Sequence, residues 1–163
     1  MLIGHGFDIH RLVAGKELVI GGVKIPYELG ADAHSDGDVI YHSVVDAILG
    51  KWPCALGLPD IGQLFPDNDP EWSGADSSVF MEEAYRRMEA RGFRVGNVDV
   101  TLILQKPKVM DIKPQMRANI VRLLDTSLAR VNVKARTHEK VDAVGEGRAM
   151  ACHVVVLLEK CPN

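Results

Sequence analysis

The sequence is poor in cysteine and has no excess of positive charge. Cys54, Cys152 and Cys161 are odd in number and lack CxxC spacing, which argues against a disulfide framework and favours reduced thiols. The formal net charge of −3 at pH 7 argues against a general nucleic-acid binder, because affinity for a phosphate backbone requires a basic surface. We therefore expect no nucleic-acid partner, and we expect any phosphate group that the protein handles to be small and bound locally.

Long apolar runs and targeting signals are also missing. No apolar run approaches the roughly 20 residues that span a bilayer, so we expect no membrane partner. The N-terminus lacks the charged and apolar segments of a secretory signal, which predicts an intracellular or organellar protein and is compatible with a transit peptide removed before Met1. There is no GxxxxGK[ST] phosphate loop, and "GEG" around Gly145 is not a dinucleotide fingerprint.

Strand and helix patterns alternate over much of the chain. Strands are expected at residues 1–13, 18–26, 93–105, 130–140 and 149–160, and amphipathic helices at 38–50, 75–92 and 116–128. Between these elements, segment 51–74 is rich in Gly, Pro and Asp and predicts a long irregular loop of the kind that is usually functional. Without repeats or a linker, the chain predicts a single domain, 1–163, of the α/β (α+β) class: a sandwich of a mixed β-sheet with helices packed on one face.

The stretch "FDIH" places two metal-capable side chains on the first expected strand. Residues i and i+2 of a strand project to the same face, so Asp8 and His10 point together, while Ile9 points the other way, into the expected core. Taken alone, this pair equally fits a partly exposed polar face.

The first expected helix supplies a third candidate ligand. His42 lies four residues after Asp38 and four before Asp46, so the three share one polar stripe, and Asp38 also suits the N-cap. A plain solvent-exposed histidine is the alternative. Asp8, His10 and His42 together offer one carboxylate and two imidazoles, and three protein ligands with an open position are typical of catalytic zinc. Asp46 is then expected to orient the His42 ring.

Two loops carry further polar clusters. In "AHSDGD", His34 would act as a donor that stabilises charge on a transferring phosphoryl oxygen, with an Asx-type turn as the simpler explanation of the segment. In "PDIGQLFPDNDP", the carboxylates of Asp60, Asp67 and Asp69 and the backbone amides freed by Gly62 suit the hydroxyls of a sugar. The same segment also fits a polar surface loop.

Two strand ends are candidates for phosphate and cation binding. Lys106 and Lys108 in "LQKPKVM" suit either phosphate neutralisation or a solvated surface. In "THEK", Thr137 and Glu139 alternate around His138 and would share a face, where Glu139 would hold a hard cation such as Mg²⁺ that bridges phosphate oxygens. Alone, "THEK" is a weak signal.

Six segments carry a resemblance over nearly the whole chain: "IGHGFDIHRL", "IGGVKIPYELGADAHSDGDVIYH", "DAILG", "DIGQLFPDNDP", "GNVDVTLILQKPK" and "VKARTHEK". With them the sequence resembles the 2-C-methyl-D-erythritol 2,4-cyclodiphosphate synthase family. The resemblance implies a lyase of the non-mevalonate isoprenoid pathway that converts 4-diphosphocytidyl-2-C-methyl-D-erythritol 2-phosphate and releases CMP. It also implies a homotrimer with active sites between subunits, with Zn²⁺ and Mg²⁺ or Mn²⁺ as cofactors. The location implied is the bacterial cytoplasm or, after transit-peptide removal, the plastid stroma.

The resemblance assigns roles to individual residues. It implies zinc ligands at Asp8, His10 and His42, a magnesium or manganese ligand at Glu139, and transition-state stabilisation by His34 and Thr137. The remaining matched positions are expected to bind the substrate: Ser35, Asp60, Ile61, Gly62, Phe65, Pro66, Asp67 and Asp69 around the erythritol unit, and Leu104, Lys106, Pro107, Lys108, Val109, Met110, Arg136 and Thr137 around the cytidine and diphosphate.

The sequence departs from many family members at three places. Arg136 stands where many have Thr, which adds a cation near the diphosphate or cytidine. Ala143 and Glu146 stand in place of a Phe and an Arg that line a central trimer cavity where an isoprenoid diphosphate can bind, so the resemblance does not extend that ligand to this chain. "KWPC" at 51–54 resembles an insertion after the metal-bearing helix and is expected to bulge outward.

Two other functions fit the residues alone. The same ligands would serve a zinc-dependent phosphohydrolase that activates water, and a non-catalytic nucleotide-binding trimer is a third interpretation.

Overall fold

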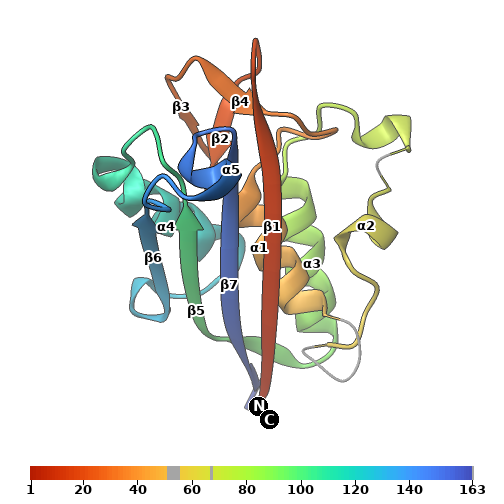
Figure 1. Cartoon of the computed structure of the whole chain (residues 1–163). Helices are drawn as coiled ribbons and strands as arrows, with labels where there is room; N and C mark the ends of the chain where they lie inside the picture. The colour runs from red at the N-terminus through yellow and green to blue at the C-terminus, as the bar shows by residue number, and fades with distance from the viewer. Residues whose placement is uncertain (51–55, 67, 163) are drawn as a thin grey trace.

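A five-stranded mixed sheet, in the order β4-β1-β7-β5-β6, carries the main helices on one of its faces (Figure 1). This computed structural model describes residues 1–50, 56–66 and 68–162. The strands are β1 (Leu2–Ala14), β2 (Leu18–Ile20), β3 (Val23–Ile25), β4 (Leu29–Ala31), β5 (Phe93–Ile103), β6 (Val131–Arg136) and β7 (Ala149–Lys160). The α-helices are α1 (Val39–Leu49), α2 (Ile61–Leu64), α3 (Ser78–Ala90), α4 (Lys113–Leu123) and α5 (Asp142–Gly145), and the 3-10 turns are η1 (Pro70–Trp72), η2 (Met110–Ile112) and η3 (Leu128–Arg130).

The two longest strands, β1 and β7, pair antiparallel through the middle of the sheet, and β5 joins β7 antiparallel and β6 parallel. The expected mixed sheet with helices on one face is therefore confirmed. None of the helices in the described part of the chain is long and apolar enough to cross a membrane.

Helix α1 lies against β1 and β7 and is covered by α3 on its other side, so almost all of its residues are buried. Gly6 on β1 permits this close approach, because a Cβ at that position would lie 1.8 Å from the backbone oxygen of Ser43 on α1. Burying an aliphatic side chain of the size of Val44 or Ile48 contributes about 1.5–3 kcal/mol, which makes α1 the centre of the core. The contact also sets how close α1 comes to the residues that follow Gly6.

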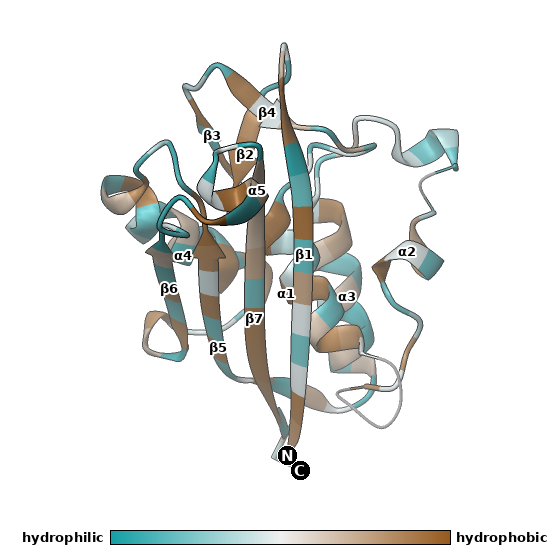
Figure 2. Cartoon of the chain, viewed as in Figure 1, coloured by the Kyte–Doolittle hydropathy of each residue, from teal (hydrophilic) through white to brown (hydrophobic). Residues whose placement is uncertain are grey.

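Among the described residues, the opposite face of the sheet is covered only at one end, where α5 packs on Ala149 and Ala151 of β7. Side chains of β1 alternate from Leu2 to Leu12, and the odd-numbered ones are exposed, including Ile3 by 64%, Phe7 by 45% and Ile9 by 49%. The expectation that Ile9 points into the core is therefore wrong, although it does point away from Asp8 and His10. We call this face, which is turned toward the viewer in Figure 2, the open face.

Several expected boundaries are corrected by local backbone geometry. Segment 18–26 is a hairpin of β2 and β3 rather than one strand, because Gly21 and Gly22 both adopt positive φ (59° and 71°) and reverse the chain. Between β3 and α1, where no strand was expected, lies β4, which pairs with the end of β1. Helix α4 begins three residues earlier than expected, with Pro114 in its first turn, where proline costs no hydrogen bond.

The expected loop 51–74 and the expected strand 130–140 also differ from the observed local structure. In the described part of 51–74, Asp60 caps the short helix α2 and Asp69 caps the turn η1. The expected strand 130–140 ends with β6, and Glu139 then adopts a positive φ of 51° that takes the chain off the sheet. The "KWPC" segment at 51–54 lies outside the described residues.

Candidate active site

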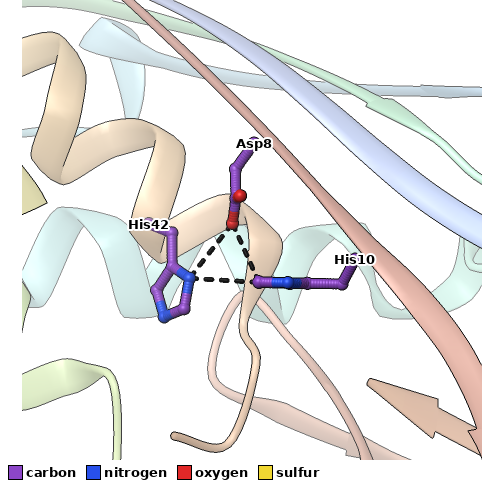
Figure 3. A group of neighbouring side chains, drawn as sticks. All are labelled: Asp8, His10 and His42. Atoms are coloured by element: carbon purple, nitrogen blue, oxygen red, sulfur yellow. Dashed lines mark hydrogen bonds and ion pairs between the residues drawn. The ribbon is translucent and has the colours of Figure 1, made fainter. Parts of the chain in front are cut away.

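Asp8, His10 and His42 converge on one point from β1 and α1 (Figure 3). The Oδ2 atom of Asp8 lies 2.9 Å from His10 Nε2 and 3.0 Å from His42 Nδ1, and these two nitrogens are 3.1 Å apart. Three candidate ligand atoms thus form a nearly equilateral triangle. One carboxylate and two imidazoles with an open side suit a zinc ion that keeps a free coordination position. The residues that we expected as metal ligands are brought together by the fold and fit such an ion.

The positions of these side chains follow from the strand and the helix cap. Asp8 and His10 lie on the helix-covered side of β1, and His42 is in the first turn of α1. Asp38 fixes where that turn begins, since its carboxylate accepts hydrogen bonds from the backbone of Ile40 and Tyr41 as well as from the turn at 21–22. Asp38 is the expected N-cap, but it is fully buried and does not join a polar stripe with His42.

The carboxylate of Asp8 and the two imidazoles each favour the charged form of the other. Burial alone would raise the pKa of Asp8, but the hydrogen bonds and positive charges of His10 and His42 outweigh it and hold that pKa well below its usual value. Burial opposes charge on His42 as well, yet its contact with Asp8 raises the pKa of the ring above the usual value. The carboxylate is therefore ionised at neutral pH, which is the form that binds a metal.

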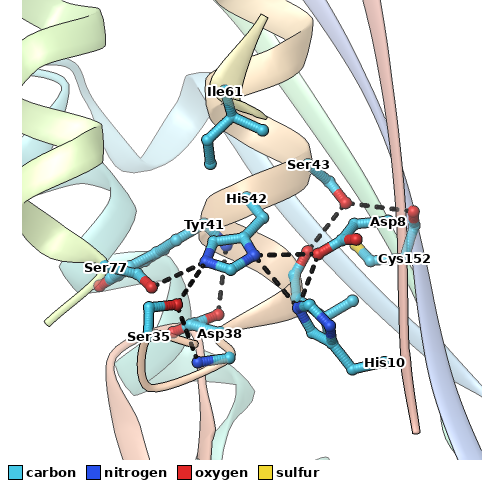
Figure 4. A network of polar contacts seen from close by, with 12 residues as sticks. Asp8, His10, Ser35, Asp38, Tyr41, His42, Ser43, Ile61, Ser77 and Cys152 are labelled. Carbon is cyan, nitrogen blue, oxygen red and sulfur yellow. Dashed lines mark hydrogen bonds and ion pairs between the residues drawn. The ribbon is translucent and has the colours of Figure 1, made fainter. Parts of the chain in front are cut away.

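The second nitrogen of His42 faces two serine hydroxyls (Figure 4). Nε2 lies 2.9 Å from Ser77 Oγ and 3.2 Å from Ser35 Oγ. Asp46, which we expected to orient this ring, instead accepts a hydrogen bond of 2.9 Å from the backbone of Ile61 and so ties α1 to the start of α2. Burial raises the pKa of Asp46 against the effect of this hydrogen bond.

A cavity of about 560 Å³ opens beside the triangle. It joins Asp8, His10 and His42 to several residues that we expected at the site, namely His34, Ser35, Ile61, Gly62 and Phe65, and it is completed by Asp32, Ala33, Trp72 and Phe80. Two aromatic residues, Trp72 and Phe80, were not predicted. Their rings pack against Phe65 with centroids 5.1 and 4.4 Å away, so they form the apolar wall of the cavity.

The rest of the expected erythritol segment lies around this cavity. His34 Nε2 is 3.1 Å from the backbone oxygen of Asp69, which anchors the ring to the loop. Asp60 makes a capping box with Gln63, and the Pro66 carbonyl accepts a hydrogen bond from the Asp69 backbone. Asp67, the remaining predicted residue of this segment, lies outside the described residues.

The expected cytidine and diphosphate residues gather at the ends of β5 and β6. A cavity of about 250 Å³ lies between the loop that follows β5 and the end of β6. Its lining includes Leu104, Pro107, Lys108, Val109, Met110, Arg136 and Thr137. Lys106 belongs to the same loop. Thr137 donates a hydrogen bond of 2.8 Å to Glu139, so these two side chains lie together, as expected, although a turn and not a strand brings them there.

The two groups of residues do not meet within one chain. The cavity of the triangle and those that hold Thr137 share no lining residue. In the sheet order, β1 and β6 are three strand spacings apart, which is about 14 Å. Within one chain the two groups therefore line separate cavities.

Ala143 and Glu146, which stand in place of a Phe and an Arg of many family members, have partners nearby in the fold. Ala143 packs in a small cluster with Val144, Ala149 and Ala151. Glu146 accepts two hydrogen bonds from Arg148, which neutralise its charge.

Comparison with known proteins gives consistent results. A protein of Oryza sativa subsp. japonica named 2-C-methyl-D-erythritol 2,4-cyclodiphosphate synthase, chloroplastic, is 60% identical over 156 residues, covering 96% of this chain and 68% of that protein. A protein of Proteus mirabilis (strain HI4320) with the same enzyme name, not called chloroplastic, is 52% identical over 160 residues, covering 98% of each. A solved CDP complex of IspF from Plasmodium falciparum matches with a TM-score of 0.86 at 39% identity, covering 99% of this chain and 97% of that one. The YgbB family model matches residues 1–159, and the chain belongs to that family.

Proposed function

We propose that this protein is a lyase of isoprenoid biosynthesis that converts 4-diphosphocytidyl-2-C-methyl-D-erythritol 2-phosphate to 2-C-methyl-D-erythritol 2,4-cyclodiphosphate and releases CMP. The observation that carries the proposal is the triangle of Asp8, His10 and His42 beside an open cavity, in a chain whose relatives bear the name of this enzyme over nearly its whole length. Residues 1–163 are proposed to act as one domain. The relatives named chloroplastic and those that are not support a plastid stroma or a bacterial cytoplasm.

In the proposed reaction, the 2-phosphate attacks the β-phosphorus, the bond from that phosphorus to the cytidylate oxygen breaks, and CMP leaves with the bonding electrons. Asp8, His10 and His42 would hold Zn²⁺, and Glu139 would hold Mg²⁺ or Mn²⁺. When bound, such ions offset the repulsion between phosphates and polarise their oxygens. The attacking phosphate is already an anion, so the chain does not need a strong general base.

The remaining residues orient the substrate. His34 and Ser35, on the cavity wall, would donate hydrogen bonds to phosphoryl oxygens, and Thr137 would do so from the other group. The amides around Gly62 and the ring of Phe65 would fix the erythritol unit, and Lys108 and Arg136 would neutralise the diphosphate at the cytidine side. Holding attacker and leaving group in line supplies much of the rate.

The proposed active form is a homotrimer with its sites between subunits. Two observations support it: the residues expected at one site occupy separate cavities of one chain, and the open face exposes Ile3, Phe7, Ile9 and Val155. Apolar side chains gathered on one face are typical of surfaces that a neighbouring chain covers.

The reaction is tested by supplying the cytidine substrate and following the products by ³¹P NMR. A cyclic diphosphate and CMP are expected. Linear phosphate products without a cyclic diphosphate would indicate a phosphohydrolase, and binding of CDP without turnover would indicate a nucleotide-binding protein. Either result would contradict the proposal.

The shared site is tested by mixing two inactive variants. His42→Ala damages one group of residues and Thr137→Ala the other. If each site combines both groups from neighbouring chains, random mixed oligomers made by co-expression regain about a quarter of the sites. Activity that stays at the level of the separate variants would contradict a site between subunits, and light scattering would report the number of chains.

A further inference from the structure

The ring of His42 can act as a metal ligand through Nδ1 only if its proton sits on Nε2. We propose that Ser77, itself held by Asp36, is the positioning residue that fixes this proton and so presents Nδ1 to the metal. Neither side chain was among the expected site residues. The inference rests on the proposed function in one respect, namely that the triangle of Asp8, His10 and His42 binds a metal ion.

A continuous chain of hydrogen bonds links the two side chains to the ring (Figure 4). His42 Nε2 lies 2.9 Å from Ser77 Oγ. The Ser77 hydroxyl in turn makes a short hydrogen bond to Asp36 Oδ1, and the Ser77 backbone N–H donates to Asp36 Oδ2 over 3.1 Å. Both carboxylate oxygens of Asp36 therefore accept hydrogen bonds from Ser77.

The direction of this chain follows from what each group can donate. An ionised carboxylate only accepts hydrogen bonds, and a serine hydroxyl has one proton to give. Because the Ser77 proton goes to Asp36, the Ser77 oxygen can only accept from His42. In the metal-free ring the ionised carboxylate of Asp8, 3.0 Å away, accepts a hydrogen bond from Nδ1. Because Nε2 keeps its own proton for Ser77, a metal ion that displaces the Nδ1 proton meets a neutral imidazole with its lone pair on Nδ1.

Ser35 does not determine the same proton. Its hydroxyl lies farther from His42 Nε2, at 3.2 Å, and accepts a hydrogen bond of 3.3 Å from the Gly37 backbone. That acceptor role leaves the Ser35 proton uncommitted, so Ser35 fits either tautomer of the ring. Ser77 fits only one.

The position of Ser77 in its helix points the same way. Ser77 is the N-cap residue of α3 and is fully buried. A serine there ordinarily accepts a hydrogen bond from the first turn, which contributes about 1 kcal/mol to the helix. Within the described residues, the Ser77 side chain makes no such capping bond. Its hydroxyl is used for His42 and Asp36 instead, at the expense of the helix end.

Asp36 connects the helices that must stay in place. It accepts hydrogen bonds from Ser77 at the start of α3 and from the backbone of Asp38, the cap of α1. The partner of the His42 ring is thus fixed to the start of the helix that carries that ring. This arrangement holds the ring orientation before any metal arrives.

Metal affinity is the first test. Ser77→Ala is expected to weaken Zn²⁺ binding by about 10–100-fold, the usual effect of removing a hydrogen-bond partner of a ligand. Competition with a chromophoric chelator on the metal-free protein would measure the dissociation constant. Ser78→Ala, the same change one residue along, is the matched control and should leave the constant unchanged. Equal affinity in Ser77→Ala and wild type would overturn the inference.

The proton on Nε2 is the second test. In the metal-free wild type, long-range ¹H–¹⁵N NMR should show a proton on Nε2 of His42 that exchanges slowly with solvent, because Ser77 accepts it. The signal is assigned by its absence in His42→Ala, and in Ser77→Ala the same proton should exchange faster. An Nε2 without a proton in the wild type, or an unchanged exchange rate in Ser77→Ala, would overturn the inference, whether or not the protein binds zinc. If zinc does not bind at all, the metal site fails while this measurement still decides the role of Ser77.

Asp36→Asn is the third test. Its amide can donate to the Ser77 oxygen, which releases the Ser77 proton toward His42 and favours the wrong tautomer. Zinc affinity should fall by a similar factor, and the Ser77→Ala, Asp36→Asn double variant should be no weaker than Ser77→Ala alone. If the losses of zinc affinity in the two single variants multiply in the double variant, Ser77 and Asp36 act independently, which would contradict the inference. Circular dichroism of each metal-free variant would check that it is folded.

Discussion

Strand β1 contributes one histidine to each of two pairs, which lie on opposite faces of the sheet and whose nitrogens are almost equally far apart. His10 and His42 approach to 3.1 Å on the helix-covered face, and His5 and His153 to 3.3 Å on the open face. The first pair has Asp8 within 3.0 Å of both rings and is only 15% and 12% exposed. The second pair is exposed and packs against Phe7. Close imidazoles alone therefore do not distinguish the candidate metal site; the ionised carboxylate and the burial do.

The largest contrast is expected from removing one histidine of each pair. His42→Ala should abolish both zinc content and activity, because it removes a ligand and leaves two. His153→Ala should leave zinc content unchanged. Elemental analysis of the purified proteins measures both. Full zinc content in His42→Ala, or its loss in His153→Ala, would reverse the assignment of the two faces.

Removing the metal should lower the melting temperature, and this effect should depend only on the site on the helix-covered face of the sheet. A ligand present at 1,000 times its dissociation constant stabilises the folded state by about 4 kcal/mol. Each kcal/mol shifts the melting temperature of a chain of this size by about 2–4 °C, so chelation should lower it by roughly 10 °C in the wild type.

The same treatment should leave His42→Ala unaffected and should act on His153→Ala as on the wild type. Differential scanning calorimetry with and without chelator measures these shifts. A chelator effect that persists in His42→Ala would place the stabilising metal elsewhere.

A smaller effect is expected at Glu139. Glu139→Gln keeps the shape of the side chain and its contact with Thr137 but removes the charge that holds a hard cation. The concentration of Mg²⁺ required for half-maximal activity should rise by about tenfold, the equivalent of about 1.4 kcal/mol. Zinc content is the internal control and should not change. An unaltered Mg²⁺ titration would exclude the proposed role.

The smallest effect is expected from adding a carboxylate to the exposed histidine pair, which tests whether a carboxylate distinguishes the metal site. Phe7→Asp adds a carboxylate beside the exposed pair, since Phe7 is the cross-strand neighbour of His153. We expect a second, weaker zinc equivalent, at least about tenfold weaker than the first, because the first site has a ligand ring positioned by Ser77 and Asp36. Titration of the metal-free protein counts the equivalents. His153→Ala in the Phe7→Asp background should remove the second one, and a single equivalent throughout would show that a carboxylate is insufficient.

The sequence allowed the metal triangle to be predicted because its geometry is local. Strand alternation puts Asp8 and His10 on one face, and the helix that carries His42 had a clear cap and apolar stripe. Alternation does not say whether a face is covered, so the expectation for Ile9 failed. The helical spacing of Asp46 was equally clear, but the partner of His42 is Ser77, which comes from another helix.

Other differences have the same origin. The pairing of Thr137 with Glu139 was expected from alternation, yet it arises from a turn that no periodicity indicates. The two glycines at 21–22 mark a hairpin, but their segment is apolar apart from Lys24 and therefore fits the pattern of one strand. Trp72 reaches the cavity from the turn η1 and Phe80 from the first turn of α3, so both depend on how α3 and the segment before it pack against distant parts of the chain. Contacts between segments distant in sequence are what the patterns leave undetermined.

The metal site depends on Gly6, a residue that is neither a candidate metal ligand nor part of the cavity wall. Every amino-acid change at this codon adds a side chain where Ser43 already lies, so α1 must move and carry His42 away from Asp8. At Gly62, on the cavity wall, an added Cβ would meet only an ordinary contact of 3.8 Å. Selection for the metal site should therefore act more strongly on the distant glycine than on the one that lines the cavity.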